Sequence, residues 1–211
     1  MAGGWSALER SLRQQGATHI AGVDEVGRGP LAGPVVVCAI VMPHDRRAIA
    51  GVTDSKQLTA AERERLADRI REVAVALALA AAPVHEIARH NVYQANARAM
   101  GRALARLGAR LGAAPDAVLV DGKPIKTLAV PHHAVVGGDA TCYSIACASI
   151  VAKVVRDRLM TRLAARHPHY GWERNAGYGT PAHLEGLRAH GLTAHHRVSF
   201  CRNALGGQLE L

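Results

Sequence analysis

Residues 21–34 read AGVDEVGRGPLAGP and combine three features. The neighbouring carboxylates Asp24 and Glu25 are residue types that gather metal cations. The Gly-Arg-Gly turn at 27–29 lets backbone approach another molecule closely, and its arginine can present donors to a phosphate. A long apolar run, residues 35–42, comes next. The stretch therefore predicts a metal-dependent site for a phosphate-rich substrate.

The regular elements around this stretch predict an α/β fold. Residues 19–24 and 33–42 are expected to pair as antiparallel strands, because the link between them is too short for a helical crossover. Residues 73–83 predict a third strand, with a helix as the alternative because Ala favours helices. Short apolar runs predict two further strands, at 117–120 and 134–136. Helices are expected at about 6–15, 60–71, 85–111 with a kink near 90–91, 141–166 and 180–190.

The length and composition indicate one domain with a real core. The chain has 211 residues, of which 49% are hydrophobic and 20% are charged. This is the composition of a globular protein rather than of a disordered one. We expect a single domain over 1–211, with a core at about 19–166 and a C-terminal cap and tail at about 167–211.

The net charge predicts a nucleic-acid partner, and the cysteines predict a reducing compartment. The 26 Lys and Arg residues exceed the 17 Asp and Glu residues, for a net charge of +9, which suits a polyanion such as nucleic acid. The alternative is a basic protein without such a partner. The four cysteines are scattered and are expected to be reduced and buried. Residues 1–13 lack the apolar core of a signal peptide, so a cytoplasmic monomer without a membrane partner is expected.

Three predicted strand ends carry acids. They are Asp24-Glu25, Asp121 and Asp139, and the last two adjoin glycines. Each Asp-Gly pair alone could be ordinary turn chemistry. Four carboxylates gathered at one point would repel one another unless cations neutralised them, and oxygen ligands favour Mg²⁺ or Mn²⁺. Two such ions could activate a water and stabilise a leaving oxygen.

The adjacency of Asp24 and Glu25 poses a geometric problem. Neighbouring residues of a regular strand point to opposite faces of the sheet. We therefore expect the strand to end or bulge at this point if both carboxylates are to share one site.

An arginine stripe follows one side of the helix predicted at 85–111. Its members are four residues apart and alternate with a Leu and Met stripe that predicts a core-facing side. The arginines are expected to form a solvated face, with part of a nucleic-acid surface as the alternative; they are Arg98, Arg102, Arg106 and Arg110.

Residues 22–33, with their Asp-Glu pair and Gly-Arg-Gly turn, resemble the signature of type 2 ribonuclease H, the ribonuclease HII family. Further blocks similar to that family stand in the expected order over about 19–200: DSK at 54–56, VDG at 120–122, GD at 138–139, SIVAKVVRD at 149–157, GYGT at 177–180 and HRVSF at 196–200.

The resemblance implies a ribonuclease H-like fold, in which helices flank a mixed five-stranded sheet and a helical extension follows. It implies cleavage of RNA in RNA/DNA hybrids, and nicking 5′ of ribonucleotides embedded in duplex DNA. Two Mg²⁺ or Mn²⁺ ions would assist the hydrolysis, which would leave 3′-hydroxyl and 5′-phosphate ends.

Roles carry over from the resemblance residue by residue. The metal-binding catalytic acids would be Asp24, Glu25, Asp121 and Asp139. The turn of Gly27, Arg28 and Gly29 would read the 2′-hydroxyl and adjoining phosphate, and the ring of Tyr178 would pack on the sugar. Backbone phosphate contacts would come from Ser55, Lys56 and Lys153.

One position within these blocks and two directly before them depart from a simple substrate contact. Asp157 lies well along a predicted helix beside Arg156 and Arg158, and is expected to be a structural ion-pair partner. Ala176 and Gly137 stand where family members often carry Lys, which should weaken local phosphate contacts.

Two other functions remain open at this point. A basic module could bind nucleic acid without cutting it, although the four acids argue against this. Another nuclease of similar fold, such as a junction resolvase or transposase, would also gather carboxylates, but it would have no need for the Gly-Arg-Gly turn or for Tyr178.

Overall fold

The computed structural model describes residues 6–206 and contains the predicted mixed five-stranded sheet. The strand order is β3-β2-β1-β4-β5. Strand β1 pairs antiparallel with β2 and parallel with β4. The strands are β1 (Ile20–Val26), β2 (Val35–Val41), β3 (Ala76–Ala82), β4 (Ala117–Asp121) and β5 (His133–Val135).

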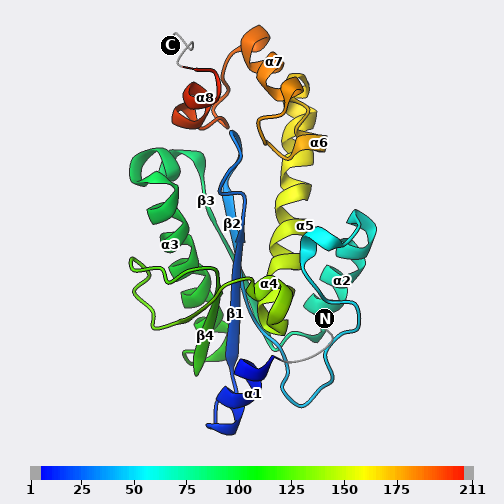
Figure 1. The fold of residues 1–211 in the computed structure, drawn as a ribbon, viewed down its shortest axis with the longest axis vertical. Helices are drawn as coiled ribbons and strands as arrows, with labels where there is room; N and C mark the ends of the chain where they lie inside the picture. The colour runs from blue at the N-terminus through cyan, green and yellow to red at the C-terminus, as the bar shows by residue number, and fades with distance from the viewer. Residues whose placement is uncertain (1–5, 207–211) are drawn as a thin grey trace.

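Helices cover both faces of this sheet and extend beyond one end of it. Figure 1 shows α3 on one face, α5 and α2 on the other, and α6 to α8 together at one end of the molecule. The helices are α1 (Ala7–Gln14), α2 (Ala60–Val73), α3 (Val84–Leu111), α4 (Gly138–Thr141), α5 (Tyr143–Arg166), α6 (Trp172–Asn175), α7 (Pro181–His190) and α8 (Val198–Ala204). Short 3-10 turns lie at η1 (Ser55–Gln57) and η2 (Pro168–Tyr170).

Most of the predicted elements are confirmed, including the strand at β3 that could have been a helix. The kink expected in α3 lies at Asn91, whose φ is 62°. The N-terminus of α2 has the predicted capping box between Thr59 and Glu62. The helix predicted over 141–166 is α5, which begins two residues later than predicted, because Cys142 is extended and separates it from the short helix α4.

Small residues let α5 lie directly against β1. A Cβ on Gly22 of β1 would lie 2.2 Å from the carbonyl carbon of Ser144 in α5, which is closer than atoms can pack. Glycine is thus required where helix and strand backbones touch. This close approach brings the polar side chains further along α5 next to the end of β1.

The arginine stripe of α3 is solvent-accessible, as the sequence predicted: Arg98, Arg106 and Arg110 are exposed and Arg102 is half-buried. Three of its guanidinium groups also bind a strand, which the sequence did not predict. Arg102 donates to the carbonyl of Ala81 at 2.8 Å, and Arg106 donates to that of Leu79 at 2.6 Å. Arg110 continues the series onto Leu77. Four residues of helix advance about 6 Å and two residues of strand about 6.7 Å, so the two repeats match. The guanidinium groups occupy outward carbonyls of β3, which is an edge strand of the sheet.

An edge strand with free carbonyls is a template for pairing with another chain. We therefore expect the triple variant with Gln at 102, 106 and 110 to self-associate while its monomers keep their fold and activity. Light scattering during incubation at about 40 °C should show growth of aggregates in the triple variant and none in the wild-type protein.

A charge-matched control separates this effect from the lost charge. Gln at Arg65, Arg98 and Arg188, which are exposed and make no hydrogen bond to a strand carbonyl among the described residues, removes the same charge. Equal aggregation of the two triple variants would show that net charge, not edge protection, keeps the protein dispersed.

The described residues also show the state of the cysteines and the character of the helices. All four cysteines are free and buried, as predicted. None of the helices within residues 6–206 is both long and apolar enough to cross a membrane.

Candidate active site

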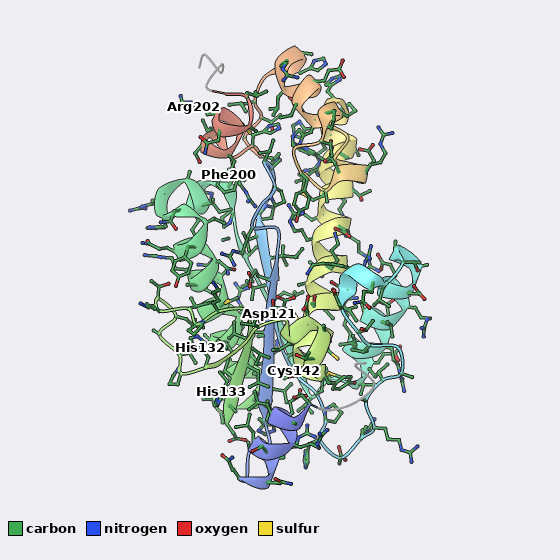
Figure 2. The ribbon with its side chains drawn as sticks, viewed as in Figure 1. Asp121, His132, His133, Cys142, Phe200 and Arg202 are labelled. Carbon is green, nitrogen blue, oxygen red and sulfur yellow. The ribbon has the colours of Figure 1, made fainter. Side chains whose placement is uncertain are left out.

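The four predicted acids line one cavity of about 340 Å³. It lies where the ends of β1 and β4 meet α4 and α5, and Figure 2 shows Asp121 near the middle of the long axis of the molecule. The remaining residues that line the cavity include every predicted substrate-binding side chain except that of Arg28. They are Val26, Ser55, Lys56, Ser149, Lys153 and Tyr178.

Asp24 and Glu25 share this cavity without the predicted strand end or bulge. The β1–β2 register continues regularly through Glu25 to Val26, so that expectation was wrong. The parallel β1–β4 register, however, stops at Val23 paired with Val120. Beyond Val23 the β4 side of β1 is open, and carboxylates from both faces can reach one space around that edge.

The same register explains the position of Asp121. It follows Val120 at the end of β4, and therefore stands beside Asp24 across the sheet. The backbone N–H of Gly138 donates to Asp121 Oδ1 at 2.7 Å and fixes this carboxylate. Asp139 comes from the first turn of α4 rather than directly from a strand end, because β5 stops at Val135.

Two cationic side chains already contact the acids. Arg28 Nη1 lies 3.1 Å from Glu25 Oε1, and Lys56 Nζ lies 3.1 Å from Asp139 Oδ2. Its hydrogen bond to Asp139 raises the pKa of Lys56. Both cations are partly exposed and can move, so they neutralise the site without closing it.

The protein environment resists further ionisation of three of these acids. Burial raises the pKa of Asp24 well above its ordinary range, and the charge of Glu25 adds to the rise. Burial also raises the pKa of Glu25, against the opposing effect of Arg28. Burial and the charge of Asp139 raise the pKa of Asp121. Uptake of either protons or metal cations therefore stabilises such a site.

The donor set fits a hard divalent cation. All four side chains offer carboxylate oxygens, the ligands that Mg²⁺ and Mn²⁺ prefer. Among the described residues, no three His, Cys, Asp or Glu side chains are yet arranged to hold a metal ion. Glu25 and Asp139 bond instead to Arg28 and Lys56, which occupy positions where a cation is favoured.

The Gly-Arg-Gly turn and Tyr178 lie together at the edge of the cavity. Gly27 has a φ of 95°, a conformation that side-chain-bearing residues rarely adopt. A Cβ on Gly29 would lie 3.7 Å from Tyr178 Cε1, so the ring stands over the turn. The ring is 48% exposed, which leaves its outer side free for another molecule.

Comparison of the chain with known protein families and relatives agrees with this geometry. The family model described as Ribonuclease HII matches residues 21–203. The chain belongs to the ribonuclease HII family. It is accordingly a metal-dependent hydrolase with ribonuclease H activity. A ribonuclease HII from Thermosynechococcus vestitus is 50% identical to it over 205 residues, which are 96% of this chain and 93% of the relative.

Solved structures of ribonucleases H share the fold. The ribonuclease H2 of Pyrococcus horikoshii OT3 is 28% identical and has a TM-score of 0.73, with 88% of this chain and 96% of that chain covered. Bst ribonuclease HIII, solved in complex with Mn²⁺, has a TM-score of 0.72 at 22% identity and covers 95% of this chain and 73% of its own. The second likeness supports the fold alone.

In this ribonuclease HII family member, the other predicted substrate-contact residues, Ser55 and Lys153, already have partners within the protein. Ser55 is buried, and its hydroxyl lies 3.0 Å from that of Ser149. Lys153 donates to Asp157 at 2.8 Å, which confirms the prediction that Asp157 is an ion-pair partner. Asp157 therefore pairs with Lys153 and not with its chain neighbours, since Arg156 is buried and Arg158 pairs with Glu64.

The sequence reasoning missed two polar residues that support the acids. The Ser149 side chain of α5 lowers the pKa of Asp24, and the Asn96 side chain of α3 lowers the pKa of Glu25. Asn96 lies four residues before Met100 on the core-facing stripe of α3. A buried amide on an apolar stripe needs a polar partner, and this was the available signal.

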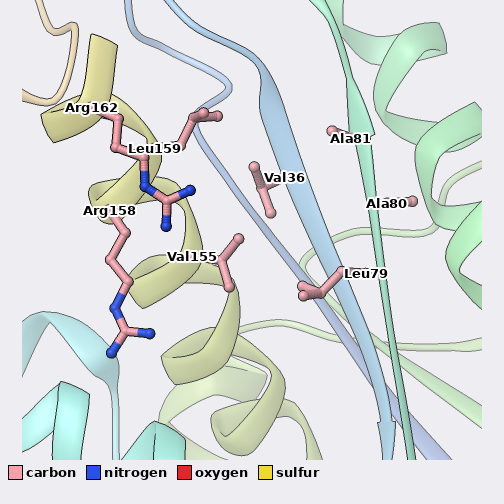
Figure 3. Close-up of a pocket in the computed structure, with 8 residues that line it drawn as sticks. All are labelled: Val36, Leu79, Ala80, Ala81, Val155, Arg158, Leu159 and Arg162. Carbon is pink, nitrogen blue, oxygen red and sulfur yellow. The ribbon is translucent and has the colours of Figure 1, made fainter. Parts of the chain in front are cut away.

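A second cavity, of about 390 Å³, lies between α5 and the sheet but has a different character. Figure 3 shows that apolar side chains and the guanidinium groups of Arg158 and Arg162 line it. It has no carboxylate among its lining residues, so the acid cavity is the one suited to ribonuclease H chemistry.

Proposed function

We propose that this enzyme cleaves the RNA strand of RNA/DNA hybrids and nicks 5′ of single ribonucleotides embedded in duplex DNA. The products carry 3′-hydroxyl and 5′-phosphate ends. The observation that carries the proposal is the position of the Gly-Arg-Gly turn and the Tyr178 ring beside a cavity lined by four carboxylates. The turn and the Tyr178 ring can select a ribose, and the four carboxylates can support hydrolysis of the adjoining phosphodiester.

The four acids, Asp24, Glu25, Asp121 and Asp139, would hold Mg²⁺ or Mn²⁺, with two ions during catalysis. Bound divalent ions activate water and stabilise the charge of a phosphodiester transition state. The chain itself supplies orientation and charge: the N–H of Gly138 fixes Asp121, and Ser149 and Asn96 favour the ionised forms of Asp24 and Glu25. Arg28 and Lys56, which pair with Glu25 and Asp139 here, would be free to contact phosphate oxygens if metal ions neutralised those carboxylates.

Substrate selection falls to the rim of the cavity. The amides at 27–29 can hydrogen-bond a 2′-hydroxyl, the group that distinguishes RNA from DNA. The exposed side of Tyr178 packs on the neighbouring sugar. Lys153 contacts the phosphate backbone after release from Asp157, and Ser55 lies in the same cavity wall.

The proposal is tested with three duplexes of one sequence: all-DNA, DNA with one ribonucleotide, and an RNA/DNA hybrid. Each is incubated with Mg²⁺, with Mn²⁺ and with EDTA, and the ends are mapped on a sequencing gel. We expect a cut 5′ of the ribonucleotide and cuts within the hybrid, in either metal but not in EDTA. Cutting of the all-DNA duplex at a similar rate, or cutting that persists in EDTA, would contradict the proposal.

A further inference from the structure

Arg197 is a buried cation without an acidic partner. Its residue is 2% exposed, and it forms no ion pair with any carboxylate in the described part of the chain. Burial and the charge of Arg156 lower its pKa to about 10, so the guanidinium stays charged near neutral pH. An unpaired buried charge is costly unless hydrogen bonds satisfy all its donors.

All three guanidinium nitrogens of Arg197 donate to backbone carbonyls of the loop at residues 27–33, which begins with the Gly-Arg-Gly turn. Its Nη2 donates to Gly27 at 2.6 Å, and its Nη1 donates to Arg28 at 2.7 Å. Its Nε and Nη2 donate to Gly33 at 3.0 and 2.8 Å. One planar group therefore ties the two ends of the loop together from its buried side.

These bonds determine where the amides of the turn point. In a trans peptide the C=O and the following N–H point in opposite directions. Because the carbonyls of Gly27 and Arg28 point at the guanidinium, the N–H groups of Arg28 and Gly29 point away from it. Both residues are exposed, and within residues 6–206 neither N–H donates a hydrogen bond. Two neighbouring amides are thus presented outward, an arrangement that binds oxygen atoms and anions.

A second buried arginine holds the rest of the loop. Arg156 of α5 donates to Pro34 at 3.0 Å, to Ala176 at 2.9 Å and to Ala32 at 3.1 Å. It therefore joins this loop to the segment that carries Tyr178. A Cβ on Gly27 would lie 2.1 Å from Arg156 Nε, so this glycine packs directly on the guanidinium.

We propose that Arg197 is a positioning residue for ribonucleotide recognition: it holds the carbonyls of Gly27 and Arg28 so that the amides of Arg28 and Gly29 face the substrate. This inference rests on the proposed function and adds to it a residue that does not line the acid cavity. Lysine cannot replace Arg197, because a single ammonium cannot span three carbonyls in one plane.

The first experiment compares Arg197→Lys with wild-type protein in Ca²⁺, by fluorescence anisotropy. The two probes are a DNA duplex with one ribonucleotide and the same duplex without it. The loss of charge-assisted hydrogen bonds should reduce the preference for the ribonucleotide roughly 10- to 100-fold. Affinity for the all-DNA duplex should change by less than about threefold. A merely structural role would lower the folded fraction and leave the preference of the folded protein unchanged.

The matched control is Arg202→Lys, in α8, the helix that Arg197 directly precedes. Arg202 is exposed, and Figure 2 shows it at the C-terminal end of the molecule. Its substitution should leave the preference at the wild-type value. An Arg197→Lys protein that folds and keeps the wild-type preference would overturn the inference.

A second measurement, on the wild-type protein, decides the matter if the variant does not fold. Amide exchange of Arg28 and Gly29 should be fast in the free protein and slow with the ribonucleotide duplex, but not with the all-DNA duplex. Protection in the free protein, or none with the ribonucleotide duplex, would overturn the inference. A wild-type protein that cuts ribonucleotide duplexes yet shows either result contradicts this inference alone, whereas one that cuts none contradicts the proposed function.

Discussion

Asp24→Asn is expected to reduce cleavage by roughly a thousandfold or more and, in the absence of divalent metal, to make the fold more stable. The activity falls because the variant lacks one carboxylate of the cavity, and the support of metal ions for phosphodiester hydrolysis is worth several kcal/mol. The stability rises because Asp24 is 6% exposed and its charge is opposed by burial and by Glu25. We expect a gain on the order of 1–3 kcal/mol near pH 8 in EDTA.

The pH dependence of this gain has a definite sign. The folded protein holds the Asp24 proton up to a pKa well above the ordinary value of 3.8, whereas the unfolded chain loses it near that value. Between these pKa values the folded state binds more protons, so the stability of the wild-type protein falls as the pH rises. The advantage of Asp24→Asn should therefore be absent below about pH 4 and grow toward neutral pH.

Urea unfolding in EDTA between pH 4 and 8 measures the stability, and the single-ribonucleotide duplex with Mg²⁺ measures the activity. Asp45→Asn is the matched control, since Asp45 is exposed in a loop and should show neither effect. Adding Mg²⁺ should stabilise the wild-type protein more than Asp24→Asn. A variant within tenfold of wild-type activity would exclude Asp24 from the catalytic set.

The sequence could predict the acids because each follows or ends an apolar run, and Asp121 does stand at the end of β4, beside Asp24 of the parallel strand β1. Asp139 lies beyond β5, in the first turn of α4. The sequence could not predict how Asp24 and Glu25 share the cavity. That depends on where β4 stops pairing with β1, and strand register is a property of two segments, not of one.

The arginines show a different limit. A helical arginine every four residues has the same pattern whether it faces water or the carbonyls of an edge strand, as Arg102 and Arg106 do. No sequence pattern marks Arg156 and Arg197 as buried. Their guanidinium groups bind backbone carbonyls of a loop, and the shape of that loop is created by tertiary packing. The family resemblance included both residues in its blocks without indicating what they contact.

Tyr178→Ala is expected to slow cleavage at a single ribonucleotide by about 5- to 150-fold with little change in stability. A ring that stacks on a nucleotide contributes about 1–3 kcal/mol, and the lost contact is with the substrate. The fold should tolerate the change because the ring is half exposed and the backbone of this residue is held independently. Its N–H donates to Asn175, and its carbonyl accepts from His183.

Single-turnover rates on the ribonucleotide duplex and the RNA/DNA hybrid, together with thermal unfolding, test this role. Tyr178→Phe keeps the ring that stands over Gly29 and should remain within about threefold of the wild-type rate if packing, rather than the hydroxyl, provides the contact. If Phe were as slow as Ala, the hydroxyl would carry the recognition. If Tyr178→Ala failed to fold, the ring would belong to the core, and ribose selection would rest on the amides of the Gly-Arg-Gly turn that Arg197 holds in place.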